Sequence, residues 1–109
     1  MRPVARWRDL GLYRLLAAMP AADLSGLLLD PPVRRLLDAP DPDLLRTVRT
    51  YLERAGNVQE TAAELHVHRQ TLYYRLAKAE ALTGLSFGNG HDRVRMHLGL
   101  MLGPLLGAD

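Results

Sequence analysis

The chain has 109 residues, 48% of them hydrophobic, which is enough for one small domain with a real core, or for a domain with an attached arm. Its formal net charge of +2 at pH 7 permits nucleic-acid binding without indicating it, and the absence of cysteine excludes disulfides and cysteine-based zinc sites. No run reaches the roughly 18 apolar residues of a membrane span and no signal-peptide pattern is present, so we expect a cytoplasmic location and no membrane partner.

The first 40 residues predict a helical arm. Apolar residues at helical spacing indicate three short helical segments in it, over residues 9–19, 20–29 and 33–37. The run Asp-Ala-Pro-Asp-Pro at residues 38–42 breaks this pattern and is the predicted linker. We therefore divide the chain into an N-terminal arm, residues 1–40, and a domain, residues 41–109.

The arm contains too many leucines for a solvated segment. These leucines are Leu24, Leu27, Leu28, Leu29, Leu36 and Leu37. They must pack on a second copy of the chain, on the second half of the same chain, or on a domain outside this sequence. We expect self-association, with packing within the chain as the alternative.

A helix is predicted from Pro42 to about Ala55. Asp41 is a good N-cap and proline is favoured at the first helical position. Gly56 ends the helix. The predicted inner stripe is Leu44, Leu45, Val48, Tyr51 and Leu52.

Two more helical patterns follow, separated by a very short break. The first runs from Val58 to Leu65 and is preceded by Asn57, a good N-cap with Glu60 three residues later, as in a capping box. The second covers about residues 69–82 and is followed by Gly84, a plausible helix-ending residue. A break as short as His66-Val67-His68 makes two amphipathic helices cross sharply while packing together, which predicts a helix-turn-helix.

After this motif we expect a loop anchored by Phe87 and a last helix over about residues 91–102, with Val94, Leu98 and Met101 inward. The predicted fold class is therefore all-α, a helix-turn-helix bundle with an N-terminal helical arm.

The outward face of the second helix carries side chains suited to reading DNA. With Leu72 inward, the spacing of 100° per residue turns Gln70, Tyr73 and Tyr74 outward. Arginine pairs with guanine and glutamine with adenine in the major groove. The base-contact candidates are His68, Arg69, Gln70, Tyr73 and Tyr74. The phosphate-contact candidates are Asn57, Thr71, Arg75 and Lys78. The alternative is a helical hairpin whose two tyrosines pack on a neighbouring helix.

Other chemistries have little support in the sequence. The four histidines lack the i,i+4 spacing of helical metal pairs, so we expect no metal site. His68 is instead expected to cap the second helix. Ser25 and Ser86 do not lie in a nucleophile motif, and no phosphate-binding or dinucleotide-binding glycine pattern occurs. We therefore expect neither an enzyme nor a cofactor.

One extended motif resembles a known family. The pattern G-N-V-x-x-T-A-x-x-L-H-V-H-R-x-T-L-x-Y-R-L is carried by Gly56, Asn57, Val58, Thr61, Ala62, Leu65, His66, Val67, His68, Arg69, Thr71, Leu72, Tyr74, Arg75 and Leu76. Together with its flanks, from about Leu44 to Leu102, it resembles the C-terminal DNA-binding module of the PucR and sugar-diacid-regulator family of bacterial transcription factors. The chain departs from the family at Gln70, where asparagine is usual, and at Ala79, where a larger aliphatic residue is usual.

The resemblance implies sequence-specific binding of double-stranded DNA by a transcriptional regulator. We expect the helix over about residues 69–82 to enter the major groove, in a homodimer that binds an inverted repeat. In the family the effector is sensed by upstream domains, so we expect no small-molecule effector site within this chain. The alternative function is a helical dimerisation or protein-interaction module without DNA binding.

Overall fold

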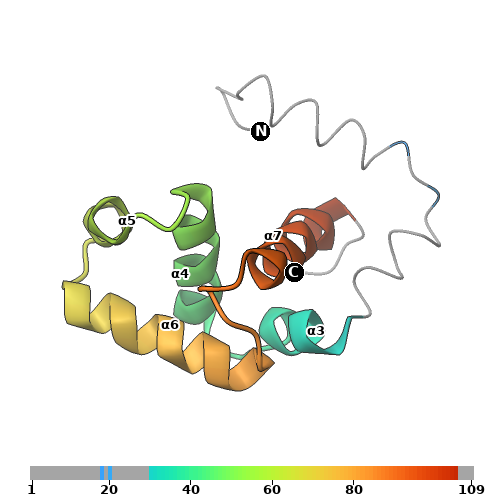
Figure 1. The fold of residues 1–109 in the computed structure, drawn as a ribbon, viewed down its shortest axis with the longest axis horizontal. Coiled ribbons are helices and arrows are strands. Elements are labelled where there is room, and N and C mark those ends of the chain that lie inside the picture. The colour runs from blue at the N-terminus through green and yellow to red at the C-terminus, as the bar shows by residue number, and fades with distance from the viewer. Residues whose placement is uncertain (1–17, 19, 21–29, 106–109) are drawn as a thin grey trace.

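The computed structural model of the chain describes residues 18, 20 and 30–105 (Figure 1). These residues form helices and no strands, which confirms the predicted all-α class. The helices are α3 (Pro31–Leu37), α4 (Pro42–Glu53), α5 (Val58–Leu65), α6 (Arg69–Thr83) and α7 (Gly90–Leu105). The helices predicted over residues 9–19 and 20–29, with Leu24 and Leu27 to Leu29, lie outside the described residues.

The helices of the second half begin where the sequence places their caps. The Asp41 carboxylate accepts hydrogen bonds from the backbone N–H groups of Asp43 at 3.0 Å and Leu44 at 3.4 Å, at the start of α4. The Asn57 side-chain oxygen accepts from the backbone N–H of Glu60 at 2.9 Å, at the start of α5. Each side chain satisfies backbone donors that have no partner inside the helix, which fixes the first turn.

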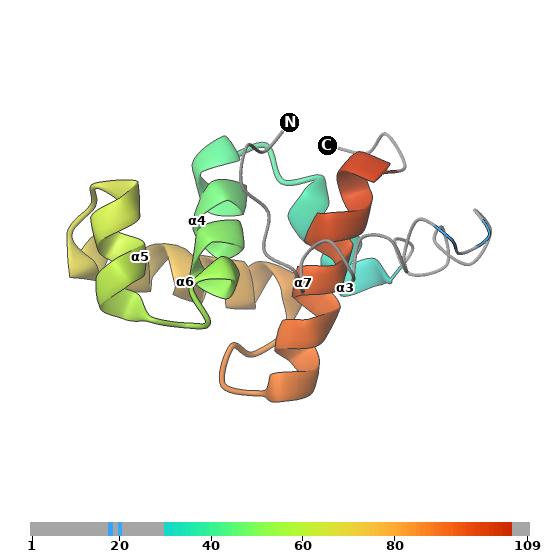
Figure 2. The ribbon, with the colours of Figure 1, turned by 90° about the horizontal axis from the view of Figure 1, so that it is seen from above.

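The core lies where α6 and α7 each meet α3 and α4. Figure 2 shows α4 between α5 on one side and α7 on the other, and α6 packs against α3, α4 and α5. The buried apolar side chains form one cluster drawn from every described helix and from the loop before α7: Val33, Leu36, Leu37, Leu44, Val48, Leu52, Leu65, Leu72, Leu76, Ala79, Leu85, Phe87, Met96, Leu100 and Leu102. Phe87 anchors its loop as predicted and meets Tyr51 edge-on, with ring centroids 5.2 Å apart.

Helix α3 belongs to this core, although the sequence placed its residues in the arm. It packs against α6 and α7, and Leu36 and Leu37 are 0% and 5% exposed. For these two leucines the expected self-association is wrong, and packing within the chain is what the structure has. The reason is that residues 38–41 do not hold α3 apart from the domain: α3 packs on α6 and α7, the helices that also pack on α4.

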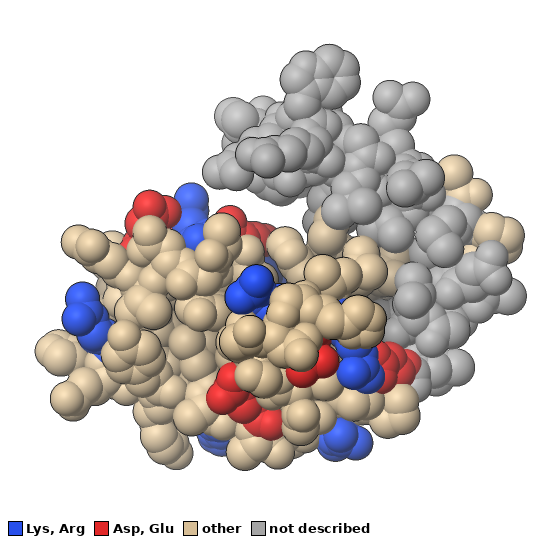
Figure 3. Space-filling view, in the orientation of Figure 1, with Lys and Arg blue, Asp and Glu red and all other residues tan. Residues whose placement is uncertain are grey.

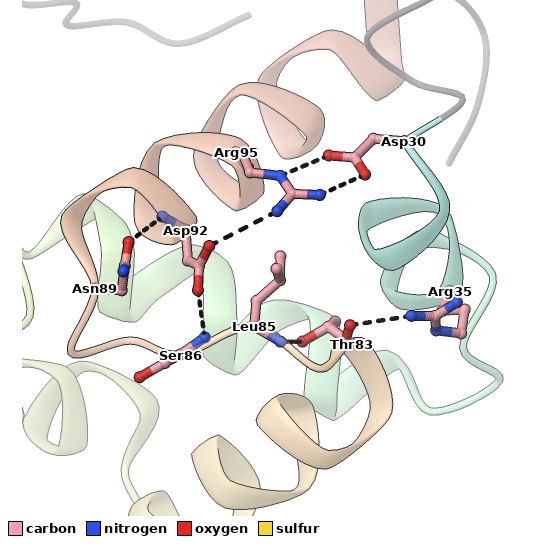
Figure 4. A network of polar contacts seen from close by, with 8 residues as sticks. All are labelled: Asp30, Arg35, Thr83, Leu85, Ser86, Asn89, Asp92 and Arg95. Atoms are coloured by element: carbon pink, nitrogen blue, oxygen red, sulfur yellow. Dashed lines mark hydrogen bonds and ion pairs between the residues drawn. The ribbon is translucent and has the colours of Figure 1, made fainter.

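Polar contacts hold α3 at both ends. The Arg35 guanidinium donates to the backbone carbonyls of Leu82 at 2.9 Å and Thr83 at 3.0 Å, where α6 ends. Asp30, which precedes α3, accepts two hydrogen bonds from Arg95 of α7, at 2.8 and 2.7 Å. Arg95 also lies 3.7 Å from Asp92, so one guanidinium joins the start of α3 to two turns of α7 (Figure 4).

The inner stripe predicted for α7 is wrong at Val94, which is 55% exposed. The buried positions are instead Met96, Gly99, Leu100, Leu102 and Gly103. Apolar residues occupy most positions from 94 to 102, so their spacing fits more than one face of a helix. The face chosen by the fold contains Gly99, where an added Cβ would lie 2.1 Å from Cγ1 of Val33. The absence of a side chain at Gly99 therefore lets α3 come close.

The Asp30–Arg95 pair predicts an acid-sensitive contribution to stability. The hydrogen bond from Arg95 holds the pKa of Asp30 below its ordinary value of 3.8. A carboxyl whose pKa is lower in the folded than in the unfolded chain stabilises the fold above the unfolded pKa, and this contribution disappears as pH falls through the folded pKa. Asp30→Asn is therefore expected to lower the urea midpoint at neutral pH. The difference from the parent chain should shrink steadily below about pH 4.

The measurement is urea denaturation of both proteins from neutral pH to about pH 3. Asp38→Asn is the matched control. Asp38 makes an exposed ion pair with Arg34 and, within the described part of the chain, no hydrogen bond or ion pair with α7. A difference between Asp30→Asn and the parent that stayed constant over this pH range would contradict the assignment.

Candidate nucleic-acid interface

The turn between α5 and α6 has only three residues, His66, Val67 and His68. His66 takes the left-handed conformation, with φ +56°, and ends α5. The backbone N–H of Val67 then donates to the carbonyl of Ala62 at 3.1 Å, and the Val67 side chain packs against the core. This geometry reverses the chain sharply between two packed helices, which is the arrangement predicted for a helix-turn-helix.

His68 begins α6 as its N-cap, as predicted. Its Nδ1 accepts a hydrogen bond from the backbone N–H of Gln70 at 3.3 Å. A neutral imidazole that accepts at Nδ1 carries its proton on Nε2. The exposed ring of His68 therefore keeps one donor at the entrance of α6.

Helix α6 separates its core face cleanly from its outward face. Leu72, Leu76, Ala79 and Thr83 are buried. Small Ala79 is fully buried and belongs to the core cluster that α6 shares with the other described helices. At its C-terminus the helix ends at Gly84, in the left-handed conformation with φ +77°, as predicted.

The outward face carries the side chains expected to contact bases. Arg69 and Gln70 are exposed, and Tyr73 and Tyr74 are 50% and 68% exposed. Tyrosines packed on a neighbouring helix would be largely buried, so the hairpin alternative does not describe this structure. These two exposed aromatic rings, together with Arg69 and Gln70, form a surface suited to a partner that offers both hydrogen-bonding and apolar edges.

The phosphate-contact candidates lie around this face and differ in their exposure and in the contacts that they already make. Asn57 is exposed, but its side-chain oxygen is engaged in capping α5. Thr71 is half-buried. Arg75 is also half-buried and donates to the Thr47 hydroxyl of α4 at 3.4 Å. Lys78 is exposed and its Nζ lies 3.5 Å from Oδ2 of Asp41.

Sequence reasoning missed the second contact of Asp41. One carboxylate oxygen caps α4, and the other faces Lys78 of α6 (37 positions along the chain). Burial alone raises the pKa of Asp41, but the hydrogen bonds from Leu44, Asp43 and Lys78 outweigh it and lower the pKa below 3.8. Asp41 is therefore ionised at neutral pH. No local pattern signals this pairing, because it depends on how α4 lies along α6.

The charge around these helices is mixed. On the face seen in Figure 3, basic and acidic side chains are interspersed over a larger uncharged surface. Arg54 and Glu64 form an ion pair between α4 and α5.

In the described ranges, no three His, Cys, Asp or Glu side chains are grouped so as to hold a metal ion. Among the same residues, none of the helices has the length and apolar content needed to cross a membrane.

Comparison with known proteins assigns this architecture to a family. The family model for the PucR C-terminal helix-turn-helix domain matches residues 44–102, from the first turn of α4 into α7. No solved structure matches the chain.

Three curated relatives share this region. The chain is 45% identical over 58 residues to the uncharacterized protein YsfB of Bacillus subtilis strain 168, covering 53% of this chain and 16% of that protein. It is 41% identical over 66 residues to the purine catabolism regulatory protein of the same strain, covering 61% and 12%. It is 34% identical over 96 residues to the carbohydrate diacid regulator of Escherichia coli K12, covering 88% and 21%.

The chain thus spans about a fifth or less of the length of these relatives. The family model, in contrast, covers more than half of the chain, residues 44–102 of 109. The matched stretch contains the turn, the whole of α6 and its exposed Arg69, Gln70, Tyr73 and Tyr74. The chain belongs to the PucR C-terminal helix-turn-helix family, a family of transcriptional regulators rather than enzymes.

Proposed function

We propose that this chain binds double-stranded DNA in a sequence-specific manner, with α6 in the major groove. The observation that carries the proposal is the division of α6 into a buried apolar face and an open face bearing Arg69, Gln70, Tyr73 and Tyr74. A helix of 15 residues is about 22 Å long. Its open face can enter a groove about 12 Å wide while its other face stays in the core.

The side chains on the open face define what the helix would read. Arg69 would pair with O6 and N7 of guanine, and Gln70 with N6 and N7 of adenine. Tyr73 and Tyr74 would contact thymine methyl groups or phosphates, and His68 would offer its Nε2 donor. Phosphate contacts from Asn57, Thr71, Arg75 and Lys78 would set the register of the helix along the groove without reading sequence.

We further propose that the DNA-binding form is a homodimer on an inverted repeat. A two-fold symmetric pair places two copies of α6 in successive major grooves, about 34 Å apart. The relatives named for purine catabolism and carbohydrate diacids are much longer than this chain. We therefore place effector sensing outside the described domain, and we place the protein in the cytoplasm, where a bacterial chromosome is accessible.

The first test is selection from random duplex DNA by the purified chain, with light scattering on the same sample. An enriched inverted repeat and a dimer mass are expected. One enriched half-site with a monomer mass would support DNA binding and contradict dimerisation by this chain alone. No enrichment, even at low salt where phosphate contacts are strongest, would contradict the DNA-binding proposal and favour a protein-interaction module.

Substitutions on the open face of α6 directly test the residues that are proposed to contact bases. Arg69→Ala and Gln70→Ala are each expected to weaken binding to the selected site by about 1–3 kcal/mol, because each removes a bidentate base contact. Since both side chains are exposed, the urea midpoint should stay close to that of the parent. The measurement is titration of the selected duplex and of variants changed at single base pairs.

Arg34→Ala is the matched control for Arg69→Ala, because it removes one exposed arginine from α3, away from the open face of α6. It should leave affinity nearly unchanged. Equal losses from Arg34→Ala and Arg69→Ala would mean that net charge, rather than base reading, sets affinity. If the two α6 substitutions unfolded the chain or separated a dimer, the interaction-module function would gain instead.

A further inference from the structure

The Lys78–Asp41 ion pair joins the open side of α6 to the start of α4. The Nζ atom of Lys78 lies 3.5 Å from Oδ2 of Asp41, and the two side chains are 50% and 39% exposed. Oδ1 of the same carboxylate caps α4 through the N–H groups of Asp43 and Leu44. Asp41 is therefore held in place by the helix that it begins, and it presents its second oxygen to Lys78.

The position of Lys78 makes this pair relevant to DNA. It is exposed two turns beyond Arg69 and Gln70, on a flank of the face proposed to enter the groove. Lysine binds phosphate as a mobile point charge, and a phosphate contact here would require the Asp41 carboxylate to give up the ammonium. The carboxylate would then remain, ionised and fixed by its cap, close to an incoming negative charge.

We propose that Asp41 sets the affinity of the chain for DNA. In the free chain its carboxylate pairs with the Lys78 ammonium, and in the complex a DNA phosphate replaces the carboxylate. This inference rests on the proposed DNA-binding function. Exposed ion pairs of this kind favour the paired state by only about 1.4- to 5-fold, so phosphate can displace the carboxylate. The exchange makes binding weaker than the same surface would allow without the carboxylate.

Asparagine at position 41 separates the two roles of this side chain. Asparagine caps a helix about as well as aspartate, but it carries no charge. Asp41→Asn is therefore expected to bind the selected duplex about two- to fivefold more tightly, with the gain largest at low salt. The urea midpoint should change little, because the cap remains. Damage to the fold would lower the affinity for DNA, so a gain in affinity cannot be explained in that way.

Two further variants make the test specific. In the Lys78→Gln background, the gain from Asp41→Asn should be clearly smaller, because the ammonium that it releases is absent and only the repulsion between carboxylate and phosphate is removed. Asp38→Asn is the matched control, since it removes the same charge from an exposed carboxylate paired with Arg34 of α3, at 3.3 Å. It should leave affinity within the error of the titration.

The experiment is a titration of the selected duplex with the full chain and these variants at several salt concentrations. Equal affinities for the parent and Asp41→Asn would overturn the inference. So would an undiminished gain in the Lys78→Gln background, or an equal gain from Asp38→Asn. In each of these cases the parent still binds, so the proposed function stands. A parent chain that binds no duplex at any salt would overturn both.

Discussion

Leu36→Ala is expected to lower the free energy of unfolding by about 2–5 kcal/mol. Leu36 is fully buried in the core that α3 shares with the rest of the described chain. Truncation removes apolar burial and leaves a cavity that the packed helices α6 and α7 can only partly close. The measurement is urea denaturation followed by circular dichroism, performed at several protein concentrations.

The concentration series tests whether Leu36 packs within the chain, as the structure has it. Packing within the chain predicts a destabilisation that does not depend on protein concentration. Packing against a second copy predicts a loss that grows on dilution. The control is Arg34→Ala on the same helix, whose exposed side chain should contribute within about 0.5 kcal/mol. A loss below about 1 kcal/mol for Leu36→Ala would mean that α3 is not part of the core.

Gly99→Leu is expected to destabilise the chain by about 3 kcal/mol, because it overfills the contact between α3 and α7. An added Cβ alone would lie 2.1 Å from Cγ1 of Val33, and Val33 is 1% exposed. A buried β-branched side chain cannot rotate freely to make room. The measurement is the urea midpoint, together with DNA affinity measured under conditions where the chain remains folded.

A double-variant cycle with smaller changes identifies the contact. Gly99→Ala alone combines a clash with a gain of up to about 1 kcal/mol in helix propensity. Val33→Ala alone leaves a cavity, and in the double variant the new methyl group should fill part of it. The pair is therefore expected to be more stable than the sum of the two single changes. Additive effects would show that these two residues do not meet.

The sequence alone predicted the elements that local chemistry determines. Helix α5 begins and ends at the predicted residues. Its start requires no distant partner, because the Asn57 side chain accepts a hydrogen bond from the backbone N–H of Glu60. The start of α6 and its end at Gly84 follow from similar local signals. The open face of α6 followed from helical periodicity, which depends only on residue spacing.

Features that depend on packing between distant segments were not predictable in the same way. The stripe of α7 was misplaced at Val94 because apolar residues occupy most positions from 94 to 102. The observed face contains Gly99, which lies close to Val33 of α3. The role of α3 was missed because a run rich in proline and aspartate can be either a spacer or a tight corner. The same holds for two side-chain hydrogen bonds between α4 and α6, which join residues far apart in sequence: Arg75 with Thr47 and Lys78 with Asp41.

Because α3 is attached to the end of α6, the two helices are expected to move together. Helix α3 packs on both α6 and α7 and forms a short lever about 10 Å long. Arg35 fastens this lever to the last carbonyls of α6, at Leu82 and Thr83. A sideways displacement of 1 Å at that end would tilt a helix of α6's length by roughly 3°. A displacement of α3 would therefore be expected to change the angle of α6, and with it the direction of Arg69 and Gln70 at the other end of that helix.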